Sequence, residues 1–302
     1  MASRTLLGFP RAADDAPVSL TQVLILAIVQ GLAELLPVSS SAHVVVAEKL
    51  LGLDPSSTPM TLLLVMLHTG TMFAVIAYFW HTWRVTYFKS AAAFRTFAAQ
   101  LIVASLVTAA VGGALMLLIE SGAFAGGPKA QIEDLFSHLE LIAPALGAVG
   151  ILILVAGLRT RGRAAGSGDL NGAQPAIIGA VQGLCLPFRG FSRSGATISA
   201  GMLLGVSRRR IEAFSFALAV VLTPPVIARE SWRLLRSGAL AAAADVHAAI
   251  GFSLLGALIA FVAGLAALKW LSRWLETERW YLFGIYCLVA ALVTASLHLA
   301  GY

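Results

Sequence analysis

The sequence predicts an all-α integral membrane protein, with six transmembrane helices plus two re-entrant helical hairpins in an inverted-topology repeat. Of its 302 residues, 59% are hydrophobic and only 12% are charged, and the mean hydropathy is +0.86. Soluble domains are usually about one quarter charged, so this composition is typical of membrane proteins. Long apolar runs and shorter, interrupted ones recur in the same order in both halves of the chain, which predicts the repeat.

Six apolar runs are long enough to cross a bilayer, which requires about 20 residues of helix. Short polar connectors separate these runs, as expected for a chain that crosses the membrane several times. The predicted spans are Met60–Trp80, Phe97–Ile119, Leu139–Leu158, Ile211–Ala228, His247–Leu268 and Trp280–Leu297.

Four shorter apolar segments come in two pairs, each interrupted by proline and serine. The first pair is Val18–Leu36 and Val44–Leu53, and the second is Gln174–Leu186 and Gly195–Gly205. These segments are too short or too interrupted to be good spans, so each pair is expected to form a re-entrant hairpin. Irregular backbone at membrane depth is tolerated only where protein or a wet cavity surrounds it.

The two halves of the chain also match by sequence. Gln30-Gly-Leu corresponds to Gln182-Gly-Leu, and Ser39-Ser-Ser-Ala corresponds to Ser192-Arg-Ser-Gly after one inserted residue. Three spans per half is an odd number, so the second half is expected to lie inverted relative to the first. The predicted organisation is a single membrane domain over residues 1–302, with a polar extension (1–17), repeat one (18–158), a linker (159–173) and repeat two (174–300).

The formal net charge of +6 is explained by membrane topology. The basic residues lie in short connectors between apolar runs, which indicates that these connectors face the cytoplasm and that both termini lie outside. Nucleic-acid binding is not supported, because the sequence has no basic face and no binding motif. Cys185 and Cys287 lie in apolar runs, and their spacing suggests neither a metal site nor a disulfide.

Glu34 is the strongest single indication of a functional site. It lies four residues after Gln30, so both residues occupy one face of a helix. A carboxylate in an apolar run needs a cation, a proton or a hydrogen-bond donor, and intramembrane polar groups are usually functional. The alternative is a structural glutamate that binds backbone groups of the facing hairpin.

His43 closes the first hairpin, four residues after Ser39. A lone histidine in a membrane protein is often an interfacial residue. Beside Glu34 and three serines, a role as nucleophile or as acid–base group becomes the better interpretation.

Arg193 is the main basic candidate, and it lies between two serines just before a short helix. A fixed guanidinium, hydroxyl groups and the N-terminal amides of a helix together form a phosphate receptor. The alternative is an arginine that serves only cytoplasmic topology.

These stretches resemble the undecaprenyl-diphosphate phosphatase family, the bacitracin-resistance type of bacterial integral membrane phosphatase. The first family motif is matched by Gln30-Gly-Leu-Ala-Glu34, Leu36-Pro-Val-Ser-Ser40 and His43, and the second by Gly190-Phe-Ser-Arg-Ser-Gly-Ala-Thr197. The resemblance extends from about residue 20 to residue 297. It implies six spans, two re-entrant hairpins, a divalent cation, and hydrolysis of a C55 isoprenoid diphosphate to the monophosphate at a site reached from the outer face.

The resemblance also implies roles for individual residues. Glu34 would hold the divalent cation, Mg²⁺ or Ca²⁺, or orient water. Ser40 and His43 would lie at the transferred phosphoryl group, one as nucleophile and the other as proton carrier, and the sequence does not decide which is which. Arg193 would clamp the diphosphate. The other residues expected to bind substrate are Gln30, Ser39, Ser41, Ser192, Ser194 and Thr197.

The sequence departs from the family pattern in three ways. Gln30 replaces an acidic residue and removes one charge that a metal could use. Arg189 stands where the family has proline, near the inserted residue, and adds a cation to the mouth of the second loop. Ser41-Ala42 replaces the more usual Thr-Gly.

The first functional hypothesis is therefore a multi-pass phosphatase of the bacterial inner membrane that acts on a polyprenyl diphosphate lipid. It would recycle the lipid carrier for cell-wall glycan synthesis and confer bacitracin resistance. A polyprenyl-phosphate transporter or flippase, with or without hydrolysis, is the alternative, because inverted repeats around a midplane polar site are transporter architecture. A structural membrane protein with a degenerate site is a third. The sequence does not define whether the chain forms a homo-oligomer.

Overall fold

The computed structural model describes residues 18–54, 57–121, 139–162, 168–236 and 246–300. In these residues every regular element is a helix, apart from one isolated bridge between Gly168 and Val206. The all-α class is therefore confirmed. The predicted polar extension (1–17) and most of the connector 120–138 lie outside the described residues, as does part of the linker 159–173.

Six helices of the described part are long and apolar enough to cross a membrane, which confirms the predicted number of spans. Several are longer than predicted, because amphipathic or polar turns extend them beyond the apolar run at one or both ends. These helices are α3 (Thr58–Thr86), α4 (Ala91–Glu120), α6 (Leu139–Arg159), α9 (Arg208–Arg236), α11 (Val246–Glu276) and α12 (Trp280–Leu299).

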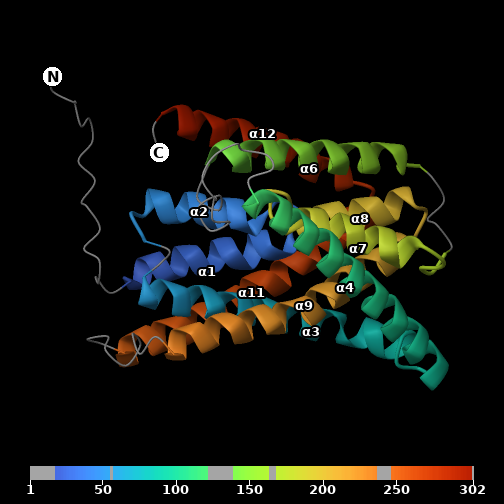
Figure 1. Ribbon diagram of the computed structural model, residues 1–302, viewed down its shortest axis with the longest axis horizontal. Helices are drawn as coiled ribbons and strands as arrows, with labels where there is room; N and C mark the ends of the chain where they lie inside the picture. The colour runs from blue at the N-terminus through green and yellow to red at the C-terminus, as the bar shows by residue number, and fades with distance from the viewer. Residues whose placement is uncertain (1–17, 55–56, 122–138, 163–167, 237–245, 301–302) are drawn as a thin grey trace.

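Four short helices form two consecutive pairs. The first pair is α1 (Leu20–Leu35) and α2 (Ser40–Leu50), and the second is α7 (Gln174–Cys185) and α8 (Arg193–Leu203). Each pair is joined by a short turn at the predicted break. In Figure 1 the two pairs extend toward opposite ends of the molecule, and their turns face one another near its middle.

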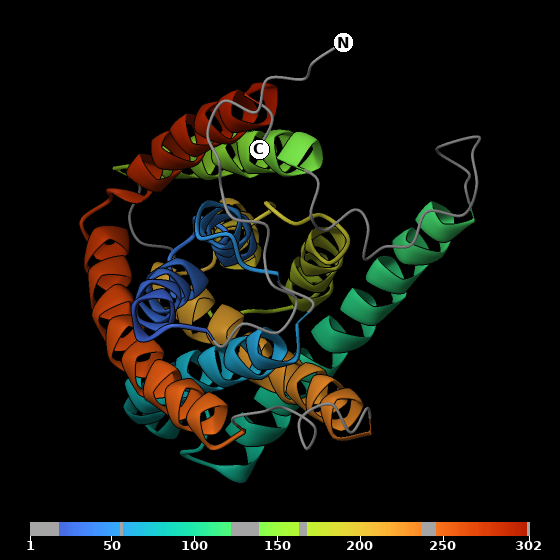
Figure 2. The same ribbon diagram turned by 90° about the vertical axis from the view of Figure 1, so that its left-hand side faces the viewer.

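The long helices surround the short ones. Figure 2, viewed from one end, shows α1, α2, α7 and α8 in the interior, with the six long helices around them. The main contacts are α6 with α12, α3 with α11, α4 with α7, and α1 with α11. The buried core includes Phe79 stacked on Phe216, and Trp83, whose indole N–H donates to the Ala213 carbonyl 3.0 Å away. This packing fixes the positions at which the short helices meet.

Arginines and acidic residues join the connectors at one end of the bundle. Arg208, at the start of α9, binds Glu278 at 3.1 Å and the Thr160 carbonyl at 2.9 Å. Arg210 binds Asp169 at 2.7 Å. The connectors that follow α6 and α11 are thereby held against the start of α9, so basic segments that are distant in sequence lie at the same end (Figure 1).

Candidate active site

The turns of the two short-helix pairs are in direct contact. The Ser194 hydroxyl donates to the Leu36 carbonyl at 3.4 Å, and the Gly190 N–H donates to the Ser41 hydroxyl at the same distance. Both contacts cross between the first pair and the second. Polar residues that are about 150 positions apart in the chain therefore share one small region, as the serine motifs predict.

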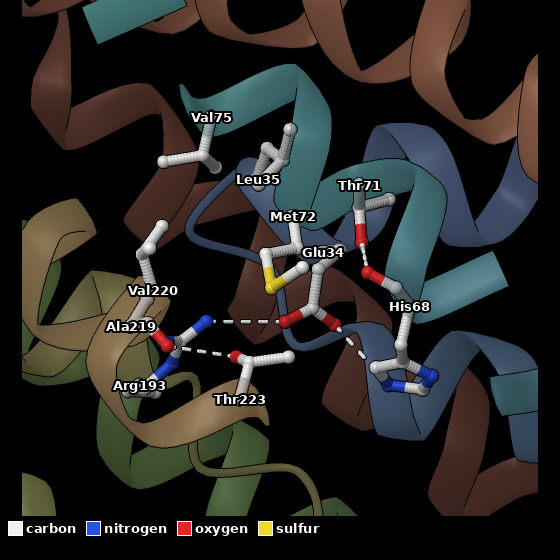
Figure 3. A pocket seen from close by; sticks show the side chains of 10 residues that line it. All are labelled: Glu34, Leu35, His68, Thr71, Met72, Val75, Arg193, Ala219, Val220 and Thr223. Atoms are coloured by element: carbon white, nitrogen blue, oxygen red, sulfur yellow. Dashed lines mark hydrogen bonds and ion pairs between the residues drawn. The ribbon is translucent and has the colours of Figure 1, made fainter. Parts of the chain in front are cut away.

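Glu34 and Arg193 form an ion pair across this junction. Glu34 lies in the last turn of α1 and Arg193 is the first residue of α8, and a guanidinium nitrogen lies 3.1 Å from Oε1 of the carboxylate. Figure 3 shows the carboxylate of Glu34 between Arg193 on one side and His68 on the other. Both partners are largely buried, with 18% and 24% of their side chains exposed. A buried carboxylate needs such a partner, because leaving it unpaired would be costly.

The second carboxylate oxygen of Glu34 has its own set of neighbours. Oε2 accepts hydrogen bonds from the Ser40 hydroxyl at 2.5 Å and from the Gln30 side-chain amide at 3.1 Å. The Nε2 atom of His68, on α3, lies 3.8 Å from the same oxygen. Glu34 is therefore the centre of the polar cluster, and three of its four neighbours belong to the predicted site.

A cavity of about 300 Å³ opens beside this cluster. This volume is at the lower end of the range for small-molecule sites, which is about 300–1,000 Å³. Both serine motifs, Glu34 and two arginines face it, together with apolar residues from the ends of α1 and α7. Its lining residues are Ala33, Glu34, Ser39, Ser40, Ser41, Cys185, Leu186, Phe188, Arg189, Phe191, Ser192, Arg193 and Ser194.

Two helices begin at this cavity. Ser39 is the N-cap of α2 and Ser192 is the N-cap of α8, where its hydroxyl accepts from the Gly195 N–H at 3.2 Å. Helix N-termini carry partial positive charge and unpaired amides, which favour anions. Ser39 also has a positive φ of 67°, an unusual conformation for a residue other than glycine. Strain of this kind is found most often at functional sites.

The cavity has an apolar rim formed by Leu186 and Phe188. These side chains follow α7 and are 40% and 41% exposed, although both are strongly hydrophobic. Exposure of this kind is expected where a protein faces lipid. The polar interior and the apolar rim together match an amphiphilic molecule with an anionic head group.

His43 is close to the cluster in sequence but is not among the residues that line the cavity. Its Nδ1 lies 2.7 Å from the Ser39 carbonyl, and its Nε2 lies 2.7 Å from the hydroxyl of Tyr286 on α12. The two rings are also stacked, with centroids 5.7 Å apart. If Nδ1 donates to the carbonyl, Nε2 accepts from Tyr286, so both ring nitrogens of neutral His43 have partners.

Thr197 is also absent from the cavity lining. It is fully buried, and its hydroxyl donates to the Arg193 carbonyl at 2.8 Å and contacts the Ser215 hydroxyl of α9 at 2.7 Å. Gln30 reaches the cavity only through its hydrogen bond to Glu34. Of the ten residues predicted for the site, seven line the cavity, and these three support its walls from behind.

The Glu34–Arg193 pair also lines a second, smaller cavity. Its volume is about 20 Å³, enough for about one water molecule, and His68, Thr71 and Thr223 line it together with the ion pair (Figure 3). His68 is held by its Nδ1, 2.8 Å from the Leu64 carbonyl. The sequence indicates His68 as a candidate donor behind the site, because a histidine inside an apolar span is a usable signal, but it gives no indication of a role for Tyr286.

The described residues contain no group of three or more His, Cys, Asp or Glu side chains that could hold a metal. Glu34 is the one carboxylate in the cavity lining, and its neighbours there are neutral hydroxyls and two arginines. Magnesium is often bound by one or two carboxylates plus the phosphates of the substrate. The donor set therefore fits a cation that arrives with a diphosphate, and it does not fit a site made by protein ligands alone.

Comparison with known proteins places the chain among membrane phosphatases. The sequence model of the bacitracin resistance protein BacA matches residues 23–293. A protein of Acinetobacter baylyi named undecaprenyl-diphosphatase 2 is 55% identical over 92% of this chain and 98% of its own length. Undecaprenyl-diphosphatases of Desulfosudis oleivorans and Rhodopirellula baltica are 35% and 32% identical to this chain. Each match covers at least 90% of this chain and at least 96% of the relative. The chain therefore belongs to the BacA bacitracin resistance family.

Proposed function

We propose that this protein hydrolyses undecaprenyl diphosphate to undecaprenyl monophosphate and inorganic phosphate, in the cavity between the two short-helix pairs. The names of its relatives support the reaction. The Glu34–Arg193 pair beside the serine-lined cavity carries the assignment of the site, because it combines a carboxylate with a phosphate-binding cation. The reaction returns the lipid carrier to cell-wall glycan synthesis and, as the family name indicates, confers resistance to bacitracin.

The membrane arrangement is part of the proposal. The six long helices span the bacterial inner membrane, and the two short-helix pairs are re-entrant hairpins related by an inverted-topology repeat. Their turns meet near the middle of the bundle, as expected for two hairpins that enter from opposite sides (Figure 1). The arginine-rich end of the bundle faces the cytoplasm, following the positive-inside rule.

The head group of the lipid binds in the cavity with its phosphates between the two helix N-termini. Arg193 supplies a guanidinium, and Ser192 and Ser194 supply hydroxyls at the start of α8. Ser39 and Ser41 face them from the start of α2. The prenyl chain leaves across the rim at Leu186 and Phe188 and remains in the bilayer.

Ser40 is the nucleophile in this proposal, and Glu34 is its base. The hydroxyl of Ser40 already donates to Glu34 at 2.5 Å, so the proton passes to the carboxylate as Oγ attacks the terminal phosphorus. The bond from that phosphorus to the bridging oxygen breaks, and undecaprenyl monophosphate leaves. Water then attacks the phosphoserine, which releases phosphate and restores the serine. Arg193 neutralises charge on the transferred group, the main requirement in phosphoryl transfer.

His43 is a positioning residue in this scheme. Its contact with the Ser39 carbonyl fixes the strained turn that presents Ser40, and Tyr286 fixes the ring. Gln30 orients Glu34 through its amide, and Thr197 holds the start of α8 through the Arg193 carbonyl. These three residues act on the reaction through their neighbours.

A divalent cation, Mg²⁺ or Ca²⁺, belongs to the proposal. It would be held by the diphosphate and by Glu34, and when bound it would neutralise negative charge on the phosphoryl oxygens. Gln30, in place of a second carboxylate, makes the protein's own contribution to cation binding small.

The test is phosphate release from a prenyl diphosphate by the purified protein in detergent. Arg193→Ala and Glu34→Ala are expected to lower the rate by at least about 100-fold. Arg209→Ala is the matched control, because Arg209 is 80% exposed and pairs with Glu276 at the surface. Normal activity in both site variants would refute the assignment. Flux of prenyl phosphate across liposomes without phosphate release would favour transport.

A further inference from the structure

A second arginine, Arg189, lines the same cavity as Arg193. It lies in the turn between α7 and α8, next to the apolar rim residue Phe188. Gly190, which follows it, has a φ of +102°, and a Cβ there would lie 2.6 Å from the Ile142 carbonyl. The Gly190 N–H also donates to Ser41. The backbone that carries Arg189 is therefore tightly fixed, and its half-buried side chain is directed by that backbone.

Glu48 of α2 lies near enough to Arg189 for the two charges to attract each other. Glu48 is only 3% exposed, and its Oε1 atom makes no hydrogen bond to any described residue. Glu48 lies two helical turns after Ser41, so it occupies the face of α2 that meets the turn between α7 and α8. A buried carboxylate with one unsatisfied oxygen is costly, and the attraction to Arg189 offsets part of that cost.

An arginine of the second hairpin thus has a carboxyl group of the first hairpin nearby at two places, with a direct ion pair at Glu34–Arg193 and an attraction between charges at Glu48–Arg189. In each pair the carboxylate comes from α1 or α2, and the arginine comes from α8 or from the turn before it. Glu34 contacts Arg193 at 3.1 Å in the cavity lining, whereas Arg189 lines the cavity directly after the rim residue Phe188 in the chain. A diphosphate carries two phosphoryl groups. The guanidinium of Arg193 is already paired with Glu34, so it cannot neutralise the charge of both phosphoryl groups.

We propose that Arg189 binds the phosphoryl group that carries the prenyl chain, and that Glu48 is its counter-ion while the cavity is empty. The proposal rests on the assignment of this cavity as the diphosphate site. Arg189 lies beside the rim where the chain leaves, so it meets the inner phosphoryl group, while Arg193 meets the terminal one. On binding, Arg189 exchanges a poorly satisfied carboxylate for a phosphate, which a guanidinium binds with two hydrogen bonds.

The experiment measures inhibition of the purified full-length protein by farnesyl monophosphate and by inorganic phosphate, with farnesyl diphosphate as substrate. Arg189→Ala is expected to raise the inhibition constant of farnesyl monophosphate about tenfold, the loss of one charged hydrogen-bonding group. The inhibition constant of inorganic phosphate, which competes at Arg193, is expected to change less than threefold. Arg189→Gln, which removes the charge and the planar fork but keeps a polar side chain, serves if the alanine variant does not fold.

Glu48→Gln distinguishes phosphate binding by Arg189 from a purely structural attraction between Arg189 and Glu48. If Glu48 only neutralises Arg189 in the empty site, this variant does not raise the inhibition constant of farnesyl monophosphate, and any decrease disappears when Arg189→Ala is added. The proposal is overturned if Arg189→Ala changes the inhibition constant of farnesyl monophosphate less than threefold, or if it raises the inhibition constant of inorganic phosphate by the same factor. It is also overturned if Glu48→Gln raises the inhibition constant of farnesyl monophosphate. Arg193→Ala is measured in parallel. Retained activity in that variant would reject the site itself, whereas loss of activity there leaves the Arg189 inhibition constants as an independent test.

Discussion

Oε1 of Glu34 and the Nη2 atom of Arg193 lie 3.1 Å apart, although 159 residues separate them in the chain. The contact exists because α1 ends, and α8 begins, at the place where the two hairpin turns meet. An acid and a cation that approach so closely hold the empty cavity near neutrality. They also place a proton acceptor and a phosphate-binding group side by side in the lining of the serine-rich cavity.

The shape of the Arg193 side chain is expected to matter as much as its charge. Arg193→Lys keeps the cation but removes the planar fork that binds a carboxylate or a phosphate with two hydrogen bonds. We expect kcat/KM for farnesyl diphosphate to fall at least tenfold, and to fall further in Arg193→Ala. Arg209→Lys, at the exposed surface pair, is the control and should behave like the unaltered protein. Equal activity in Arg193→Lys would show that a point charge is sufficient.

Asparagine is expected to replace His43 better than glutamine does. An asparagine amide can take the place of Nδ1 and donate to the Ser39 carbonyl, which is the contact that holds the turn. We expect His43→Asn to keep kcat within about tenfold of the unaltered protein, with a larger loss in His43→Gln and a small one in Tyr286→Phe. A loss of about 1,000-fold in His43→Asn would instead assign the imidazole a direct part in proton transfer or nucleophilic attack.

Restoring an acidic residue at position 30 is expected to increase the dependence on metal. In Gln30→Glu the amide that donates to Glu34 Oε2 is lost, and two carboxylates face each other. We expect the thermal midpoint in chelator to decrease, and added Mg²⁺ or Ca²⁺ to raise it by several degrees more than in the unaltered protein. Thermal unfolding in detergent measures this effect without reference to activity. An identical response to cation in both proteins would exclude position 30 from the cation site.

The contact between α3 and α11 allows no side chain at Gly70. A Cβ at this position would lie 2.1 Å from the Ala257 carbonyl, so Gly70→Ala forces the two backbones apart. We expect a loss of about 1–3 kcal/mol in the free energy of unfolding, as for other overpacked cores. Gly113→Ala is the control, because a Cβ there meets nothing within 4 Å. That variant should be neutral or slightly more stable, since alanine favours helix by up to about 1 kcal/mol.

Glu278 makes the loop before α12 sensitive to acid. The hydrogen bond from the Gly162 N–H, and then that from Arg208, lower the pKa of Glu278 below its ordinary value. Because the folded pKa lies below the unfolded one, this contribution to stability is present above about pH 4.3 and is lost as the pH falls through the folded pKa. Thermal midpoints measured from pH 7 to pH 3.5 should therefore fall less steeply in Glu278→Gln, and identical slopes would contradict this expectation.

The larger elements of the fold could be predicted from the sequence because lipid imposes simple rules on it. Apolar runs of sufficient length, such as Met60–Trp80, became helices in the same places. The breaks at Pro37 and Pro187 became turns, because proline cannot continue a helix. The sequence analysis predicts that this helix begins at Gly195, but α8 begins two residues earlier, at Arg193. Ser192 caps the helix, so Arg193 and Ser194 are already helical.

The finer geometry of the site depends on contacts between distant helices. The isolated motif containing His43 gives no indication that the ring meets Tyr286, which lies 243 residues later. Thr197 follows Arg193 by one helical turn, which places it behind the arginine, against Ser215 of α9. Sequence spacing defines the face of a helix that a residue occupies, but the neighbour on that face is chosen by the packing of the whole bundle.

In the proposed function, the rim at Leu186 and Phe188 also sets how the protein meets its substrate. A lipid whose chain crosses this rim enters and leaves by lateral diffusion in the bilayer, and it never has to enter water. Its effective concentration is then a surface density, so the apparent KM should follow the mole fraction of substrate in the membrane or micelle and not its bulk concentration. In the proposed arrangement, isoprene units beyond the rim would contact only lipid and would influence the reaction through partitioning alone.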